Sequence, residues 1–183
     1  MKQFDNTPKE LPKYCSKEEI EVVIDKANHD TGKHGRRNHL ILTVLWQTGM
    51  RAEEITNLRK KDIQTDTIII RGGKGGKDRV IPIKNDLRTS VLLYSDQLNG
   101  DEQIFPLSTR QIRNIVYHYS ELHPHTFRHS FAVHCLKSGM NLRSLQRMLG
   151  HNSITTTQIY LDLTAQDVKE DFKKVNWGKV SER

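Results

Sequence analysis

Tyr160 is the residue of this chain with the most evident chemical use, and it lies in a threonine-rich segment shortly after His151. A phenol is a poor nucleophile at neutral pH because its unperturbed pKa is about 10. It can attack a phosphodiester when neighbouring cations neutralise the phosphate charge. Side chains of a suitable type are present at Arg51, His125, Arg128 and His151. Together these residue types favour phosphoryl-transfer chemistry.

The local spacing favours convergence of these side chains. His125 and Arg128 lie three residues apart, so on a helix they share one face and can contact one ligand. Arg51 follows an expected helix end at Gly49 and precedes a short helix, where a guanidinium can bind two phosphate oxygens. Taken alone, Arg51 is also typical of a surface arginine.

Tyr160 is expected near the end of a helix. Gly150 fits the C-terminal end of the preceding helix and leaves His151 in a loop, after which Asn152 or Ser153 caps the next helix. That helix can carry the phenol toward a phosphate as a unit. The alternative is that Tyr160 is a core residue of an amphipathic helix.

A glycine-rich segment separates two β-branched runs at 67–70 and 79–83. It is not a nucleotide-binding P-loop, because Asp78 and a strand follow its second lysine where a Ser or Thr and a helix are required. The two runs instead predict an antiparallel hairpin with Lys74 and Lys77 at its flexible tip.

The order along the chain is Arg51, a lysine in a Gly-rich loop, His125-x-x-Arg128, Leu149-Gly150-His151 and then Tyr160. This order resembles the tyrosine recombinase (phage integrase) family over about residues 10–165. The resemblance implies a site-specific DNA recombinase or integrase of a mobile element. Such an enzyme cuts and rejoins strands through a 3′-phosphotyrosyl intermediate, with no metal, nucleotide or other cofactor.

The resemblance also implies a role for each site residue. Tyr160 is the nucleophile, and Arg51, Arg128 and His125 stabilise the transition state. His151 holds the phosphate by a hydrogen bond, and His125 is the expected partner of the Tyr160 proton.

The hairpin and the first arginine bring further residues. Lys74 matches the lysine that protonates the 5′ oxygen, and Lys77 is the alternative. Lys77 and Arg79 are expected to contact DNA. Glu54 resembles the acidic residue that supports the family's site, and a capping or surface role is its alternative.

We expect three segments: an extended lead-in (1–13), the catalytic domain (14–163), and a C-terminal helix and tail (164–183) that docks on a neighbouring protomer or on its own domain. Family members usually carry a separate N-terminal domain. The chain is therefore expected to be a catalytic fragment or a short, single-domain invertase-like enzyme. Expected partners are double-stranded DNA and further copies in a dimer or tetramer on DNA, without a membrane or a small-molecule substrate.

Other functions also fit this sequence. A type IB topoisomerase shares the chemistry, and a non-cutting DNA-binding regulator shares the fold. Zinc is a further alternative, because histidines at 123, 125, 129 and 134 cluster in one segment, although the Glu of a His-Glu-x-x-His motif is absent. We expect His129 and His134 to be structural.

Composition agrees with a DNA-binding protein. There are 29 Lys+Arg against 22 Asp+Glu, a net charge of +7, and the basic excess lies within residues 31–160. Cys15 and Cys135 fit neither a disulfide framework nor a thiolate zinc site. No signal peptide or membrane span is visible, so a cytoplasmic, nucleoid-associated protein is expected.

Periodicity predicts a mainly α-helical domain with a small antiparallel sheet of three strands, the tyrosine recombinase catalytic-domain fold by resemblance. The third strand is expected at 103–105. Helices are expected at 16–28, 40–48, 52–59, 86–98, 108–120, 125–138, 141–149, 153–161 and 164–175. Ser16 and Glu19 form a capping box for the first, and Phe127, Phe131 and Cys135 form a buried stripe.

Overall fold

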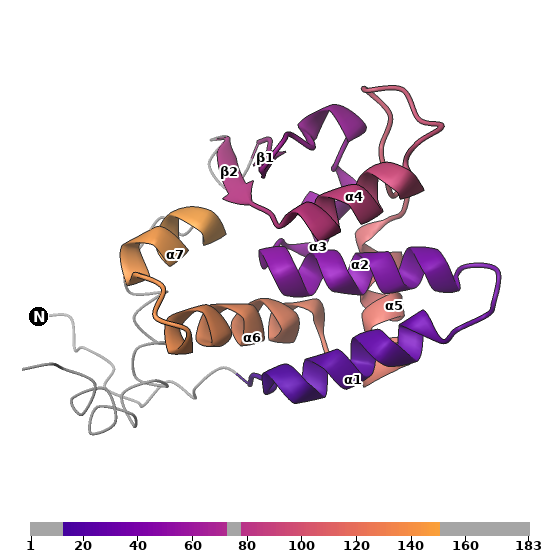
Figure 1. Ribbon diagram of the computed structural model, residues 1–183. Coiled ribbons are helices and arrows are strands. Elements are labelled where there is room, and N and C mark those ends of the chain that lie inside the picture. The colour runs from indigo at the N-terminus through magenta and orange to yellow at the C-terminus, as the bar shows by residue number, and fades with distance from the viewer. Residues whose placement is uncertain (1–12, 73–77, 151–183) are drawn as a thin grey trace, which may run out of the picture.

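The computed structural model describes residues 13–72 and 78–150, which form a group of helices with one β-hairpin (Figure 1). In chain order the elements are α1 (Lys17–Asn28), α2 (Gly35–Thr48), α3 (Ala52–Thr56), the 3-10 helix η1 (Lys60–Asp62), β1 (Thr67–Ile70), β2 (Arg79–Pro82), α4 (Asn85–Tyr94), α5 (Thr109–Ser120), α6 (Pro124–Lys137) and α7 (Leu142–Leu149). The predicted mainly helical fold is confirmed. In the part of the chain described, no helix is long and apolar enough to cross a membrane.

The helix ends follow local chemistry. The Ser16 hydroxyl accepts the Glu19 backbone N–H at 3.2 Å, and the Glu19 carboxylate accepts the Ser16 N–H at 2.7 Å, which confirms the predicted capping box. Gly49 and Gly150 end α2 and α7 in the left-handed conformation, at φ of 62° and 63°. Both glycines lie at the turns from which the site residues emerge.

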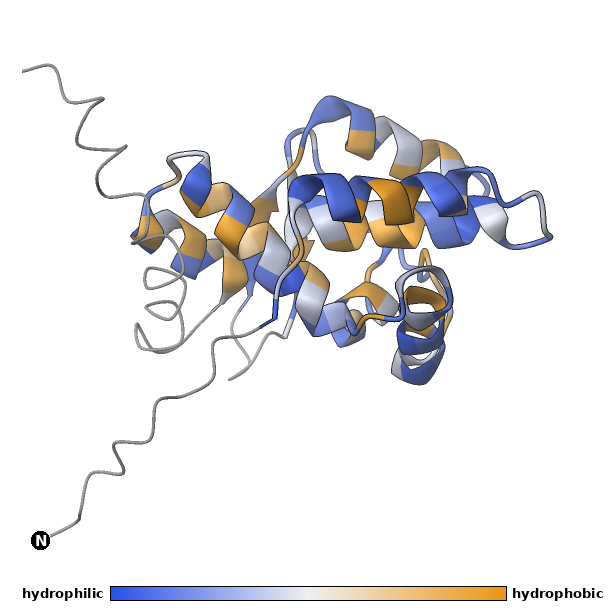
Figure 2. Ribbon diagram, turned by 90° about the horizontal axis from the view of Figure 1, so that it is seen from below, coloured by the Kyte–Doolittle hydropathy of each residue, from blue (hydrophilic) through white to orange (hydrophobic). Residues whose placement is uncertain are grey.

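The core lies around α2, which packs against α1, α4 and α6. Four apolar residues of α2 recur at helical spacing and are all buried, namely Leu40, Ile41, Val44 and Leu45. Each side chain of this size contributes about 1.5–3 kcal/mol when it leaves water. Figure 2 shows the same pattern, with apolar and polar segments alternating along the helices. This framework fixes the end of α2, which lies just before Arg51 in the chain.

The predicted stripe on α6 is present. Phe127 and Phe131 are buried, and Cys135 is half-buried against the same core. Phe131 lies so close to Gly49 that a Cβ there would approach its Cδ1 to 2.4 Å. The close contact between α6 and the end of α2 brings Arg128 next to the turn that precedes Arg51.

The sheet has two strands among the described residues, not three. β1 and β2 pair antiparallel, with Thr67 opposite Pro82 and Ile70 opposite Arg79. The third strand predicted at 103–105 is wrong: Gln103 forms a single bridge with Arg59. Ile104 and Phe105 are buried in the core. Their β-branched and aromatic side chains suit the core as well as a strand, so composition alone does not distinguish the two.

Several helix boundaries also differ from those predicted. The helix expected at 86–98 ends at Tyr94, and the one expected at 52–59 ends at Thr56 before η1. The helices expected at 153–161 and 164–175, and the segments 1–12 and 164–183, lie outside the described residues.

Candidate active site

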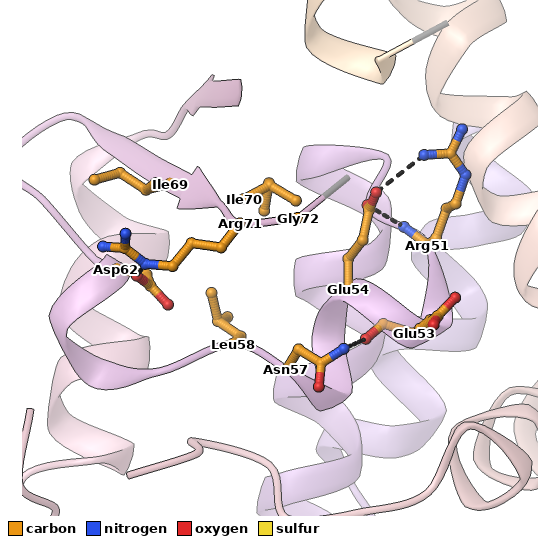
Figure 3. A pocket seen from close by; sticks show the side chains of 10 residues that line it. All are labelled: Arg51, Glu53, Glu54, Asn57, Leu58, Asp62, Ile69, Ile70, Arg71 and Gly72. Carbon is orange, nitrogen blue, oxygen red and sulfur yellow. Dashed lines mark hydrogen bonds and ion pairs between the residues drawn. The ribbon is translucent and has the colours of Figure 1, made fainter. Parts of the chain in front are cut away.

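Arg51 stands at the N-terminus of α3 and is held by Glu54. Its backbone N–H donates to Glu54 Oε2 at 2.8 Å, and its Nη1 donates to Glu54 Oε1 at 3.0 Å (Figure 3). The Arg51 side chain is 24% exposed, whereas that of Glu54 is only 9% exposed. Glu54 therefore combines the capping role with a contact to the guanidinium, two roles that the sequence left as alternatives.

Arg128 joins two turns of the chain from within the core. Its side chain is on α6 and the residue is 3% exposed. Nη1 donates to the Gly49 carbonyl at 2.7 Å, and Nη2 donates to the Leu149 carbonyl at 2.5 Å. Arg128 thus connects the turn before Arg51 with the last residue of α7.

The two arginines and His125 surround one cavity of about 100 Å³. These three predicted site residues therefore line a common cavity. The other charged or polar side chains that line it are Glu53, Thr109, Arg113 and His123. A cavity of this size lined by guanidinium and imidazole groups suits a single anionic group.

His125 is tuned toward its neutral form. Although His125 is an exposed residue, partial burial lowers its pKa below the usual 6.5, and the charges of His123, Arg128, Arg51 and Arg113 lower it further. Its ring lies nearly parallel to that of His123, with 5.5 Å between the centroids. A neutral imidazole at pH 7 can accept a proton, which is the role expected of His125.

Glu54 keeps its charge in spite of its burial. Burial alone raises its pKa, but hydrogen bonds from Arg79 and from the Arg51 backbone, with the charges of Arg79 and Arg128, bring the pKa below its usual value. The Glu54 carboxylate therefore faces three guanidinium groups, those of Arg51, Arg79 and Arg128.

Arg79 differs from its prediction. Its three guanidinium nitrogens donate inside the protein, Nη1 and Nη2 to Glu54 and Nε to the Met148 carbonyl. The side chain is 9% exposed, so this geometry does not support the predicted contact with DNA. A strand position gives no sign in the sequence of where so long a side chain ends.

Arg113 is a residue that sequence reasoning missed. It lies on α5, lines the cavity beside His125 and contributes to the low pKa of that imidazole. Its position one turn after Thr109 is visible in the sequence, but the sequence does not indicate that this face of α5 meets α3 and α6.

The remaining predicted site residues, Lys74, Lys77, His151 and Tyr160, lie outside the described residues. The structure does describe the residues beside them. The Gly72 N–H donates to Asp78 Oδ1 at 2.9 Å across the base of the lysine loop, and Gly150 immediately precedes His151.

The two histidines predicted to be structural, His129 and His134, are both partly buried. His129 has a pKa lowered to about 4, mainly by burial and then by His125 and Arg128. The ring of His134 lies 5.3 Å from that of Trp46, centroid to centroid. Within residues 13–72 and 78–150, no group of three or more His, Cys, Asp or Glu side chains is arranged to hold a metal ion.

Known proteins resemble this chain in sequence and in fold. The tyrosine recombinase XerA of Pyrococcus furiosus is 36% identical over 186 residues, which cover 92% of this chain and 64% of that protein. A crystal structure of a XerA recombinase has a TM-score of 0.75 at 26% identity, covering 95% of this chain and 68% of the other.

A XerH site-specific recombinase, solved bound to a palindromic difH substrate as a post-cleavage complex, also has a TM-score of 0.75. It is 24% identical, and the match covers 93% of this chain and 55% of that one. The chain thus spans less than two thirds of the length of its XerA relative. Because the Phage integrase family model matches residues 13–167, the chain belongs to the phage integrase family.

Proposed function

We propose that this chain carries the catalytic domain of a site-specific tyrosine recombinase, which cuts and rejoins double-stranded DNA through a 3′-phosphotyrosyl intermediate. The observation that carries the proposal is the cavity shared by Arg51, His125 and Arg128. Membership of the phage integrase family over residues 13–167 adds support.

The scissile phosphate occupies this cavity in the proposed reaction. The Tyr160 oxygen attacks phosphorus, and His125 takes the phenolic proton. The bond to the 5′ oxygen breaks, and that oxygen receives a proton from Lys74. Arg51 and Arg128 stabilise the charge of the transition state, where loss of one preorganised donor typically costs about 10²–10³ in rate.

The second half of the reaction reverses these steps on another strand. A 5′ hydroxyl attacks the phosphotyrosyl link, Tyr160 leaves and recovers a proton, and the phosphodiester is restored. The link conserves the energy of the original bond, so the proposed cycle needs neither a metal nor a nucleotide. His151 completes the phosphate site by a hydrogen bond.

The proposed partner is duplex DNA, with further copies of the chain assembled on it. The net charge of +7 and the arginine-lined cavity support a polyanionic substrate, and the XerH neighbour was solved bound to a palindromic difH substrate. Because recombination joins two duplexes, we propose assembly into a dimer or tetramer at the nucleoid.

The test is covalent capture on a nicked suicide duplex from DNA flanking the gene. Wild-type protein forms an adduct that survives denaturing electrophoresis, and Tyr160→Phe binds the same DNA without forming it. Tyr117→Phe is the matched control, because Tyr117 is 63% exposed and outside the cavity. An adduct formed by Tyr160→Phe would move the nucleophile elsewhere.

Two further readouts separate other functions. Joined products from two duplexes indicate a recombinase, whereas plasmid relaxation without joined products would indicate a topoisomerase, and binding without any adduct a regulator. The adduct is expected to form in excess EDTA. Loss of the adduct in EDTA, with recovery on adding zinc, would favour the histidine alternative.

A further inference from the structure

The Arg79 guanidinium is held by hydrogen bonds within the protein. It is the first residue of β2 and directly follows the loop that carries the lysines. Its Nη1 and Nη2 donate to the two carboxylate oxygens of Glu54, each at 2.8 Å, and both side chains are 9% exposed. A bidentate arginine–carboxylate pair that is shielded from water holds both side chains in a defined geometry.

The same carboxylate also holds Arg51. Glu54 Oε1 accepts from both Arg79 Nη1 and Arg51 Nη1, and Oε2 accepts from Arg79 Nη2 and the Arg51 backbone N–H. Displacement of Arg79 would therefore release the group that orients the Arg51 guanidinium. One carboxylate connects β2 with the N-terminus of α3.

Arg79 reaches the end of α7 as well. Its Nε donates to the Met148 carbonyl at 2.7 Å, while Arg128 donates to the next carbonyl, that of Leu149. Gly150 leaves space for this arrangement, because a Cβ there would lie 3.0 Å from Arg79 Cδ and 3.2 Å from its Nε. The last turn of α7 is thus held by two arginines at adjacent carbonyls.

Arg71 provides a comparison at the other end of the loop. It donates through Nε to Asp62 Oδ1 at 2.6 Å, but its side chain is 50% exposed. Figure 3 shows Arg71 with Asp62 on one side of a cavity of about 320 Å³, and Arg51 with Glu54 on the other. Both ends of the loop have an arginine–carboxylate pair, and only the one at Arg79 is joined to the site.

We propose that Arg79 is a positioning residue for strand cleavage. Through Glu54 it fixes Arg51, and through the Met148 carbonyl it fixes the end of α7 that leads to His151. Arg79 acts from inside the protein and does not contact DNA. The inference rests on the proposed function, because it assigns Arg51 and the residues after α7 to the same reaction.

The pH dependence of cleavage distinguishes positioning from general stabilisation. The charged groups that face Glu54 are Arg51 at the N-cap of α3, Arg79 on β2 and Arg128 on α6. Burial raises the Glu54 pKa and the arginines lower it, so removing Arg79 raises it. Glu54 then becomes protonated at a higher pH than in the wild type and ceases to orient Arg51 by charge.

The experiment measures the single-turnover rate of adduct formation on the suicide duplex, from about pH 5 to pH 8. Arg79→Met is expected to cleave about 10²-fold more slowly at neutral pH, as for a small misplacement of a catalytic group. Its rate falls further as the pH decreases. DNA affinity is expected to stay near the wild-type value, since Arg79 is internal.

Three control variants separate the positive charge at position 79, the bidentate contact with Glu54 and the protonation of Glu54. Arg79→Lys keeps the charge without the two-point contact and is expected to recover part of the rate. Arg71→Met stays near the wild-type rate. Combining Arg79→Met with Glu54→Gln removes the additional fall at low pH, because an amide does not titrate.

An Arg79→Met profile parallel to that of the wild type, or a loss no larger than that of Arg71→Met, would overturn the inference. If Arg79→Met does not fold, Arg79→Lys decides it, and wild-type kinetics in that variant would also overturn it. A wild-type protein that forms no adduct would instead refute the proposed function.

Thermal melting tests the anchor without DNA. Glu54 has a lowered pKa when folded, so its contribution to stability is present above the ordinary Glu pKa and is lost as the pH falls through the folded value. The stability cost of Arg79→Met should therefore be full at neutral pH and shrink in acid. A cost independent of pH would contradict the charged anchor.

Discussion

Arg128 Nη1 donates a hydrogen bond to the carbonyl of Gly49 at 2.7 Å, and this contact joins α6 to the turn that presents Arg51. The two residues are 79 positions apart in the sequence. The second arginine of the proposed phosphate site therefore also contacts the turn from which the first one extends, so the two arginines are linked through the backbone of that turn.

The first prediction concerns Arg128→Lys. An ammonium is a compact charge on a flexible stem and cannot replace a planar guanidinium that donates to the carbonyls of both Gly49 and Leu149. A carbonyl left unsatisfied in the core costs about 1–3 kcal/mol. Urea unfolding should show this loss, and adduct formation should fall about 10²-fold or more. Arg143→Lys, at an exposed position of α7, should change neither quantity.

The second prediction separates backbone strain from packing at Gly49. Gly49→Ala has to adopt a φ of 62° and places its methyl group 2.4 Å from Phe131 Cδ1. Gly139→Ala has a φ of 86° with no atom within 4 Å, so it carries the backbone strain alone. We expect a loss of about 1–2 kcal/mol at Gly139 and about 1–3 kcal/mol more at Gly49. Equal losses in urea unfolding would show that α6 moves away without cost.

The sequence predicted those features that depend on neighbouring residues. The Ser16–Glu19 capping box, the glycine at the end of α2 and the apolar spacing of α2 are local, and all are present. The antiparallel pairing of β1 with β2 was predicted from two β-branched runs on either side of a glycine-rich loop.

The features that failed depend on contacts between distant segments. Residues 103–105 have the composition of a strand, but the core accepts Ile104 and Phe105 and leaves one bridge. The direction of the Arg79 side chain was also not visible in the sequence, which predicted only that it contacts DNA. That direction is set by a buried carboxylate on α3 and a carbonyl on α7, neither of which is near Arg79 in sequence.

The third prediction is a shift in the pH profile of cleavage on changing Arg113. If neutral His125 accepts the Tyr160 proton, the rate is constant above the His125 pKa and falls below it. Burial, the other site charges and Arg113 lower this pKa. Arg113→Gln removes one cation, so the pKa rises and the fall in rate begins at a higher pH. His118→Gln, at an exposed position of the same helix, should leave the profile unchanged.

If the pH–rate profile of Arg113→Gln coincides with that of the wild type, protonation of His125 does not cause the fall in cleavage rate at low pH. His125→Ala supplies the reference, because a variant without the imidazole should no longer show the part of the low-pH fall in rate that His125 causes. DNA affinity measured in parallel separates this effect from a contact between Arg113 and the DNA backbone.

The last prediction distinguishes Lys74 from the arginines by changing the substrate. If Lys74 donates a proton to the 5′ oxygen, sulfur in place of that bridging oxygen gives a leaving group that needs no proton. Lys74→Ala, which should lose about 10²–10⁴ in rate on ordinary DNA, is then expected to regain activity. Arg51→Ala should remain slow on both substrates, because charge on the non-bridging oxygens still has to be stabilised. Lys77→Ala is the control, with a mild defect and little recovery. Recovery of Lys77→Ala alone would move the acid to Lys77, and recovery of neither variant would place it outside the loop.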